Sequence, residues 1–82
     1  MKIAVDISLY PLDADFIPPI KDVIDRLNEH DKLEVLTNAM STQVVGEFDD
    51  VMDALKQEIG TTFEQIPKGV FVIKMFNHPG QP

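Results

Sequence analysis

The sequence of 82 residues contains no cysteine and no tryptophan, and aromatic residues make up only 7% of it. The lack of cysteine excludes disulfide bridges, thiolate metal ligands and a cysteine nucleophile. Basic residues are also few, since 7 lysines and arginines stand against 14 aspartates and glutamates, for a formal net charge of -7. Nucleic acids and anionic membranes bind clusters of basic side chains, so we expect neither as a partner. No segment approaches the roughly 20 consecutive apolar residues of a membrane-spanning helix.

The chain length predicts one domain over residues 1–78, with residues 79–82 as a tail. The opening residues are typical of a strand and not of a signal peptide, because Asp6 interrupts the apolar run. This start and the absence of cysteine, which suits a reducing compartment, predict a cytoplasmic protein. A domain this small buries roughly 60–65% of the surface of its unfolded chain, so self-association would strengthen a marginal core.

Hydrophobic periodicity predicts four strands and two helices. The expected strands cover residues 3–10, 33–37, 42–46 and 70–76, and the expected helices cover 16–27 and 48–59. We expect Asp13 or Asp15 to cap the first helix, whose first turn accommodates Pro18 and Pro19. Gly60 is expected to end the second helix.

The order of these elements is strand, helix, strand, strand, helix, strand. With right-handed crossovers, it gives one antiparallel sheet with both helices on one face, an α+β ferredoxin-like βαββαβ sandwich in which strands one and three are neighbours. The opposite sheet face stays bare, and on the first strand it carries Ala4, Asp6, Ser8 and Tyr10. Association of two sheets into a dimer or tetramer is the simplest cover. The alternative leaves Val70, Val72 and Phe76 as partly exposed single residues.

Few residues offer catalytic chemistry. His30 and His78 are far apart in the sequence and both are expected at the surface, as is Arg26 on the outer side of the first helix. Asp49 and Asp50 are neighbours on a helix, so their side chains point about 100° apart and do not converge on one catalytic position. We expect them instead to stabilise the positive N-terminal end of the helix. We therefore expect no enzyme, no cofactor and no bound metal.

Small uncharged polar side chains crowd together between the second and third strands. Their hydroxyl and amide groups suit a neutral or cationic heterocycle, and Asn38 offers a donor beside an acceptor. Met40 adds a soft apolar contact. The candidate ligand-binding residues are Asp6, Ser8, Asn38, Met40, Ser41 and Thr42. Two alternatives stay open: Asn38 and Ser41 serve the turn alone, and Asp6 is solvated or paired with Lys74.

Residues 5–12 (VDISLYPL) and 38–52 (NAMSTQVVGEFDDVM) resemble the small thiamine-binding, YkoF-like proteins of ferredoxin fold. The resemblance covers nearly the whole chain. It implies a βαββαβ fold, sheet-packed dimers or tetramers, and binding of thiamine or its hydroxymethylpyrimidine precursor near the subunit interface. Carried onto this sequence, the contacts fall on Asn38, Ser41 and Thr42, with Asp6 and Ser8 beside them.

The sequence thus predicts a cytoplasmic carrier or scavenging protein that binds thiamine, or its hydroxymethylpyrimidine moiety, without catalysis. The scarcity of lysine and arginine near residues 37–42 disfavours a phosphorylated ligand. The alternative is a homo-oligomeric structural or regulatory module that senses a different small molecule.

Overall fold

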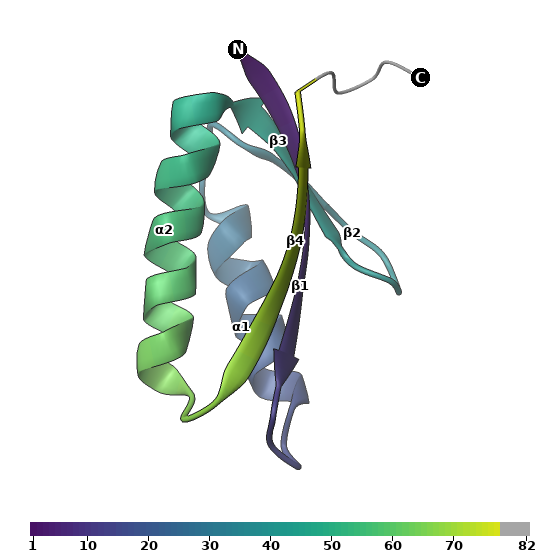
Figure 1. Cartoon of the computed structure of the whole chain (residues 1–82), viewed down its shortest axis with the longest axis vertical. Coiled ribbons are helices and arrows are strands. Elements are labelled where there is room, and N and C mark those ends of the chain that lie inside the picture. The colour runs from purple at the N-terminus through teal and green to yellow at the C-terminus, as the bar shows by residue number, and fades with distance from the viewer. Residues whose placement is uncertain (78–82) are drawn as a thin grey trace.

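The computed structural model describes residues 1–77 and has the six expected elements in the expected order (Figure 1). His78 and the tail of residues 79–82 lie outside the described residues. The elements are β1 (Lys2–Pro11), α1 (Ile17–Asn28), β2 (Glu34–Thr37), β3 (Thr42–Glu47), α2 (Phe48–Gln65) and β4 (Gly69–Phe76). Within residues 1–77, no helix has the length and apolar character needed to cross a membrane.

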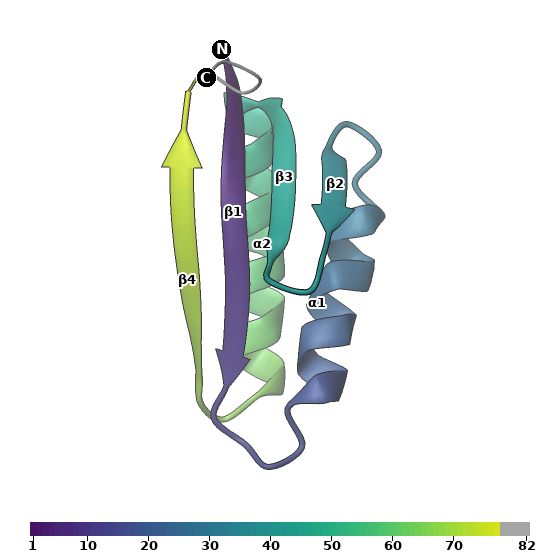
Figure 2. The same ribbon diagram turned by 90° about the vertical axis from the view of Figure 1, so that its right-hand side faces the viewer.

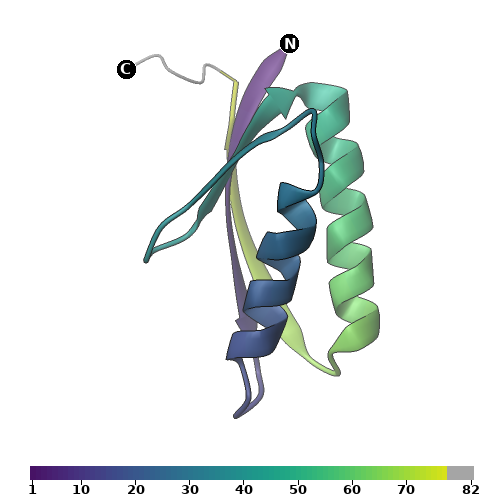
Figure 3. The same cartoon turned by 180° about the vertical axis from the view of Figure 1, so that it is seen from behind.

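The strands form one antiparallel sheet in the order β2-β3-β1-β4, so β1 and β3 are neighbours in its middle as predicted. Both helices lie on the same face of this sheet (Figures 1 and 3). The ferredoxin-like α+β arrangement is therefore confirmed. The opposite face is called the outer face below, and within residues 1–77 it carries no helix (Figure 2).

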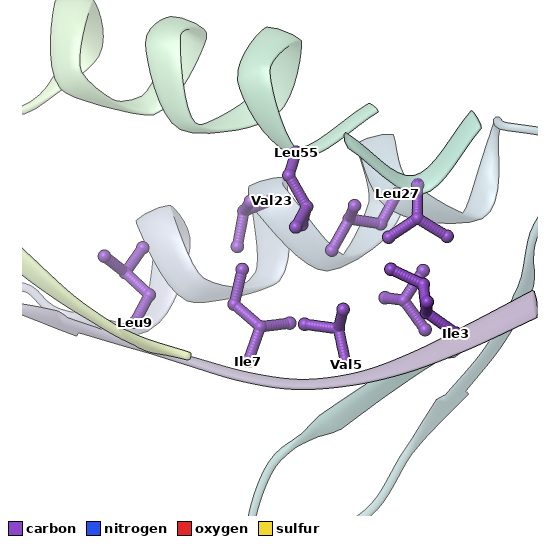
Figure 4. Packing of buried hydrophobic residues seen from close by; sticks show 9 residues of the cluster. Ile3, Val5, Ile7, Leu9, Val23, Leu27 and Leu55 are labelled. Carbon is purple, nitrogen blue, oxygen red and sulfur yellow. The ribbon is translucent and has the colours of Figure 1, made fainter. Parts of the chain in front are cut away.

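The core lies between the sheet and the two helices. Alternate residues of β1 point toward the helices, where they meet side chains of α1 and α2 (Figure 4). Each such side chain contributes about 1.5–3 kcal/mol when it is buried, so the period-two pattern of β1 decides which sheet face receives the helices. The buried cluster consists of Ile3, Val5, Ile7, Leu9, Val23, Leu27, Val44, Val51 and Leu55.

Two predicted helix boundaries were wrong. Helix α2 continues through Gly60 to Gln65, because its last turns bury Thr62 and place Phe63 against Phe71 of β4, with ring centroids 5.5 Å apart. This packing outweighs the roughly 1 kcal/mol cost of a glycine inside a helix. Neither Asp13 nor Asp15 caps α1.

The segment before α1 forms a turn of its own. The Asp13 Oδ1 atom accepts the backbone N–H of Asp15 at 2.9 Å, and the helix begins after Phe16 without a side-chain cap. The two prolines, Pro18 and Pro19, lie in the first turn of α1 as predicted. The loop between β1 and α1 is thus held by an aspartate turn, two residues ahead of the helix.

A buried carboxylate joins the two helices. The side chain of Glu58 on α2 is only 5% exposed, and its Oε1 and Oε2 atoms lie 3.3 Å from Arg26 Nε and 2.6 Å from His30 Nε2. Arg26 Nη2 also donates to the Thr62 hydroxyl at 2.6 Å. Arg26 and His30 were predicted at the surface, but their side chains are only 17% and 24% exposed. They turn inward because a buried carboxylate is tolerated only when charged or polar partners surround it.

Gly60 gives a direct test of the extended helix. A Cβ atom at this position would have no neighbour within 4 Å, so alanine adds helix propensity without a clash. We expect Gly60→Ala to raise the free energy of unfolding by about 0.5–1 kcal/mol, measured by urea denaturation. As a control, Gly46→Ala should gain less or destabilise, since its Cβ would lie 2.9 Å from Leu33 Cδ2. A loss of stability in Gly60→Ala would contradict a helix through this residue.

Candidate functional site

The connection between β2 and β3 is a tight turn built around Asn38. The backbone N–H of Asn38 donates to the Ser41 carbonyl at 3.0 Å. The Oδ1 atom of Asn38 accepts hydrogen bonds from the backbone N–H groups of Met40 and Ser41 at 2.8 and 3.1 Å. An asparagine side chain that bonds to the backbone two or three residues ahead stabilises such a turn. The turn therefore holds the small polar residues of this hairpin in place.

Strand β3 of the hairpin is shorter than its neighbour β1. Pairing of β1 with β3 ends at Ile7 and Thr42, whereas pairing of β1 with β4 continues to Pro11 and Gly69. The end of β1 thus runs past the hairpin, alongside the first half of α1 (Figure 2). The edge of β1 that β3 leaves uncovered becomes one side of a cavity.

This cavity has a volume of about 480 Å³, within the roughly 300–1,000 Å³ of small-molecule pockets. Its walls come from the end of β1, the loop that follows, the inner side of α1, and the hairpin. The lining residues are Ile7, Ser8, Leu9, Tyr10, Pro11, Leu12, Phe16, Ile20, Val23, Ile24, Leu27, Thr37, Asn38, Ala39, Met40, Ser41, Thr42 and Phe71. None of these carries a charge.

Apolar and polar groups occupy different parts of the lining. The α1 side presents aliphatic residues and Phe16, while the hairpin side presents hydroxyl and amide groups. The hydroxyl oxygens of Thr37 and Thr42 are 3.0 Å apart, and Thr42 is buried. A planar heterocycle suits such a site, because its faces pack on apolar walls while its edge makes hydrogen bonds.

Behind the polar side lies Asp6, on the outer face of β1. The Ser41 hydroxyl donates to Asp6 Oδ1, and Gln43 Nε2 donates to the same oxygen at 3.2 Å and to Ser41 Oγ at 2.8 Å. Hydrogen bonds from Ser41 and then Gln43 lower the pKa of Asp6, and nearby Lys74 lowers it further, although partial burial opposes them. Lys74 Nζ is 3.8 Å from Asp6 Oδ2 but its side chain is 80% exposed, so this pair is weak.

Five of the six candidate residues line the cavity: Ser8, Asn38, Met40, Ser41 and Thr42. Asp6 does not line it and instead supports Ser41 from behind. The geometry also agrees with the two alternatives, a turn role for Asn38 and an ion pair of Asp6 with Lys74. Asn38 holds the turn, and Asp6 lies beside Lys74. Their roles toward a ligand stay predictions.

Sequence reasoning missed the apolar wall of the cavity. The apolar residues of α1 have helical spacing, and this spacing does not distinguish a core contact from a cavity wall. A signal was present in the loop, where Leu12 and Phe16 flank the acidic residues 13 and 15. Both are large apolar side chains that remain about half exposed at this cavity.

A sequence model of the YKOF-related family matches residues 2–77, which is nearly the whole chain. The chain belongs to the YkoF-related family. The match includes the hairpin, the end of β1 and all of α1, so every part of the cavity lies within the family region. No curated protein matches this sequence.

Solved structures share the fold. A hypothetical protein from Methanocaldococcus jannascii is 26% identical with a TM-score of 0.81, over 99% of this chain and 84% of that chain. A protein from Thermotoga maritima named "putative thiamine biosynthesis/salvage protein" is 24% identical with a TM-score of 0.72, over 98% and 87%. A protein from Streptococcus pneumoniae is 20% identical with a TM-score of 0.77, over 98% and 90%.

The Asp6 network predicts an acid titration. Because the pKa of Asp6 is lower in the folded chain than its ordinary value of 3.8, this carboxylate stabilises the fold above that pH, and the contribution is lost as the pH falls through the lowered value. We expect Ser41→Ala to raise the pKa of Asp6 toward its ordinary value, as followed by NMR of the carboxyl carbon.

The control for this titration is Lys74→Ala, which removes only the weak ion pair and should move the pKa of Asp6 less than Ser41→Ala does. The reverse order of the two shifts would show that charge, and not the hydroxyl, keeps Asp6 ionised.

Proposed function

We propose that this protein binds thiamine, or the hydroxymethylpyrimidine part of thiamine, reversibly in the cavity between the hairpin and α1. It acts as a cytoplasmic carrier or scavenging protein and performs no catalysis. The observation that carries this proposal is the uncharged cavity, in which apolar walls meet a side of hydroxyl and amide groups. Membership of the YkoF-related family and the similarity to the Thermotoga maritima protein, which is named for thiamine biosynthesis or salvage, support it.

The pyrimidine is the part of thiamine that suits the cavity. It is planar and neutral, with a polar edge for the hairpin residues and apolar faces for the α1 side. The cationic thiazolium would then lie toward the loop between Leu12 and Phe16, two residues that line the cavity, because this loop carries Asp13 and Asp15. Phosphorylated forms fit less well, since the described lining residues offer no cationic side chain to a phosphate.

The chemistry of Asp6 supports binding without catalysis. A general base works best when its pKa lies near the operating pH, and the pKa of Asp6 is moved the other way, below 3.8. Its Oδ1 atom already accepts two hydrogen bonds, from Ser41 and Gln43. This carboxylate therefore supports the hairpin and is poorly suited to take a proton from a ligand.

Isothermal titration calorimetry with hydroxymethylpyrimidine, thiamine and thiamine diphosphate tests the function. We expect saturable binding of the first two and weaker binding of the diphosphate. In Asn38→Asp, the oxygen that holds the turn is kept while the Nδ2 donor is lost. Hydroxymethylpyrimidine should then bind about fivefold to tenfold more weakly, as expected for one hydrogen bond.

The matched control is Asn77→Asp, which makes the same chemical change at an exposed residue just beyond β4. It should leave the affinity unchanged. If no ligand gives heat with folded, ligand-free protein, the proposed function fails and a sensing module for another small molecule becomes the better reading. If Asn38→Asp binds as wild type, Asn38 does not contact the ligand.

We also propose that the outer face packs against the outer face of a second copy. Strand alternation and register place five exposed apolar side chains on this face, around Asp6, Gln43 and Lys74. They are Tyr10, Leu36, Val70, Val72 and Phe76. A two-fold contact buries such a patch against itself. It would also close the side of the cavity formed by Ser8 and Tyr10, so ligand binding and assembly would be coupled.

Val72→Glu tests this assembly, because it places a charge among the apolar side chains of the proposed contact. We expect the dimer dissociation constant, measured by sedimentation equilibrium, to rise about tenfold or more. This corresponds to at least about 1.4 kcal/mol of lost association free energy. Met52→Glu on α2 is the control, since Met52 is similarly accessible but lies on the helix layer. A wild-type protein that stays monomeric at high concentration would refute the contact.

A further inference from the structure

The hydrogen-bonding capacity of the hairpin is already partly used within the protein. A serine hydroxyl has one proton to donate and two acceptor positions. Ser41 donates its proton to Asp6 Oδ1, and it accepts from Gln43 Nε2 at 2.8 Å. What remains on Ser41 for a ligand is therefore one acceptor position and no donor.

Asn38 is restricted in the opposite sense. The backbone N–H groups of Met40 and Ser41 both donate to one atom of the Asn38 side-chain amide, so this atom is the oxygen. Both acceptor positions of the oxygen are therefore occupied within the protein. What remains on Asn38 is the Nδ2 group, which only donates. Because Asn38 and Ser41 both line the cavity, its polar side offers a donor from one residue and an acceptor from the other.

We propose that Asp6 is a positioning residue, which takes the Ser41 proton and so makes the site selective for a ligand with an N–H donor at that place. An exocyclic amino group next to a ring nitrogen meets both demands, since the amino group donates to Ser41 while the ring nitrogen accepts from Asn38. This inference rests on the proposed function and adds the cause of ring selectivity. Asp6 acts without touching the ligand.

The fixed direction of the Ser41 proton is the central step. Asp6 Oδ1 accepts hydrogen bonds from the Ser41 hydroxyl and from Gln43 Nε2. An ionised carboxylate is a stronger hydrogen-bond acceptor than a neutral group. Turning the hydroxyl toward the cavity would leave a charged oxygen with one hydrogen bond fewer. A ligand that offers only an acceptor opposite Ser41 therefore meets a lone pair, which is repulsive.

The experiment compares hydroxymethylpyrimidine with the analogue in which a methoxy group replaces the amino group. The methoxy compound keeps the ring nitrogens but lacks the N–H donor beside the ring nitrogen. We expect wild-type protein to favour the amino compound by about tenfold. In Ser41→Ala and in Asp6→Ala, this ratio should fall toward equality.

The ratio of affinities separates positioning from structural support. If Asp6 only stabilised the hairpin, Asp6→Ala would weaken both compounds equally and leave the ratio unchanged. Lys74→Ala is the control, because it removes the ion pair but leaves the Ser41 proton on Asp6, and it should keep the wild-type ratio. Should Asp6→Ala fail to fold, Ser41→Ala at the partly exposed hairpin still decides the outcome.

Failure of this inference differs from failure of the proposed function. If both compounds bind wild-type protein equally, or if the ratio survives in Ser41→Ala, the positioning role is overturned while binding itself stands. If neither compound binds at all, the proposed function fails and the inference falls with it.

Discussion

The length difference between β1 and β3 is the constraint on which the rest of the molecule depends. β1 has ten residues and β3 has six, and their register ends at Ile7 and Thr42. On the other side, β4 follows β1 to Pro11, so the end of β1 stays extended without β3 beside it. The space that a longer β3 would fill becomes the cavity, and the hairpin turn becomes its polar side. The cavity is thus a consequence of strand length and not of a special loop.

Helix α1 must stay at a fixed distance from the sheet for this cavity to keep its shape. Its inner residues serve two purposes, since Val23 and Leu27 belong to the buried core and also line the cavity. The Glu58 carboxylate contacts the same helix through Arg26, and contacts His30 just beyond its end. Moving α1 away from α2 would leave the Glu58 carboxylate buried without its partners, so this contact opposes such a shift.

The sequence predicted most of the fold because the signals were local. Alternation in β1, helical spacing in both helices and the proline-rich start of α1 each depend on residues close in the chain. Gly60 led to a wrong prediction of the end of α2, because a glycine is a local stop signal. The packing that continues the helix comes from other elements. The contact of Phe63 with Phe71 joins the end of a helix to the following strand, and neither the helical nor the strand pattern alone predicts it.

The candidate site shows the same division. The hairpin residues were found because small polar side chains stood together in the sequence, and five of the six candidates do line one cavity. The opposite wall was not found, since Ile20 and Ile24 have the same spacing whether they face a core or a cavity. The partners of Glu58 were missed for a related reason, because a polar residue on a helix is expected outside unless its partner on another helix is known.

Charge explains why Asp6 lies where it does. The chain is strongly acidic, yet the described lining of the cavity is uncharged, so its carboxylates stand outside the walls. Among the described carboxylates, Asp6 is hydrogen-bonded to the lining through Ser41, and the same hydrogen bonds favour its ionised state. A charge inside the cavity would bind any cation without regard to shape. In the proposed arrangement the charge acts one bond further away, through the fixed direction of the Ser41 proton, and a fixed acceptor position distinguishes ligand geometries as a bare charge does not.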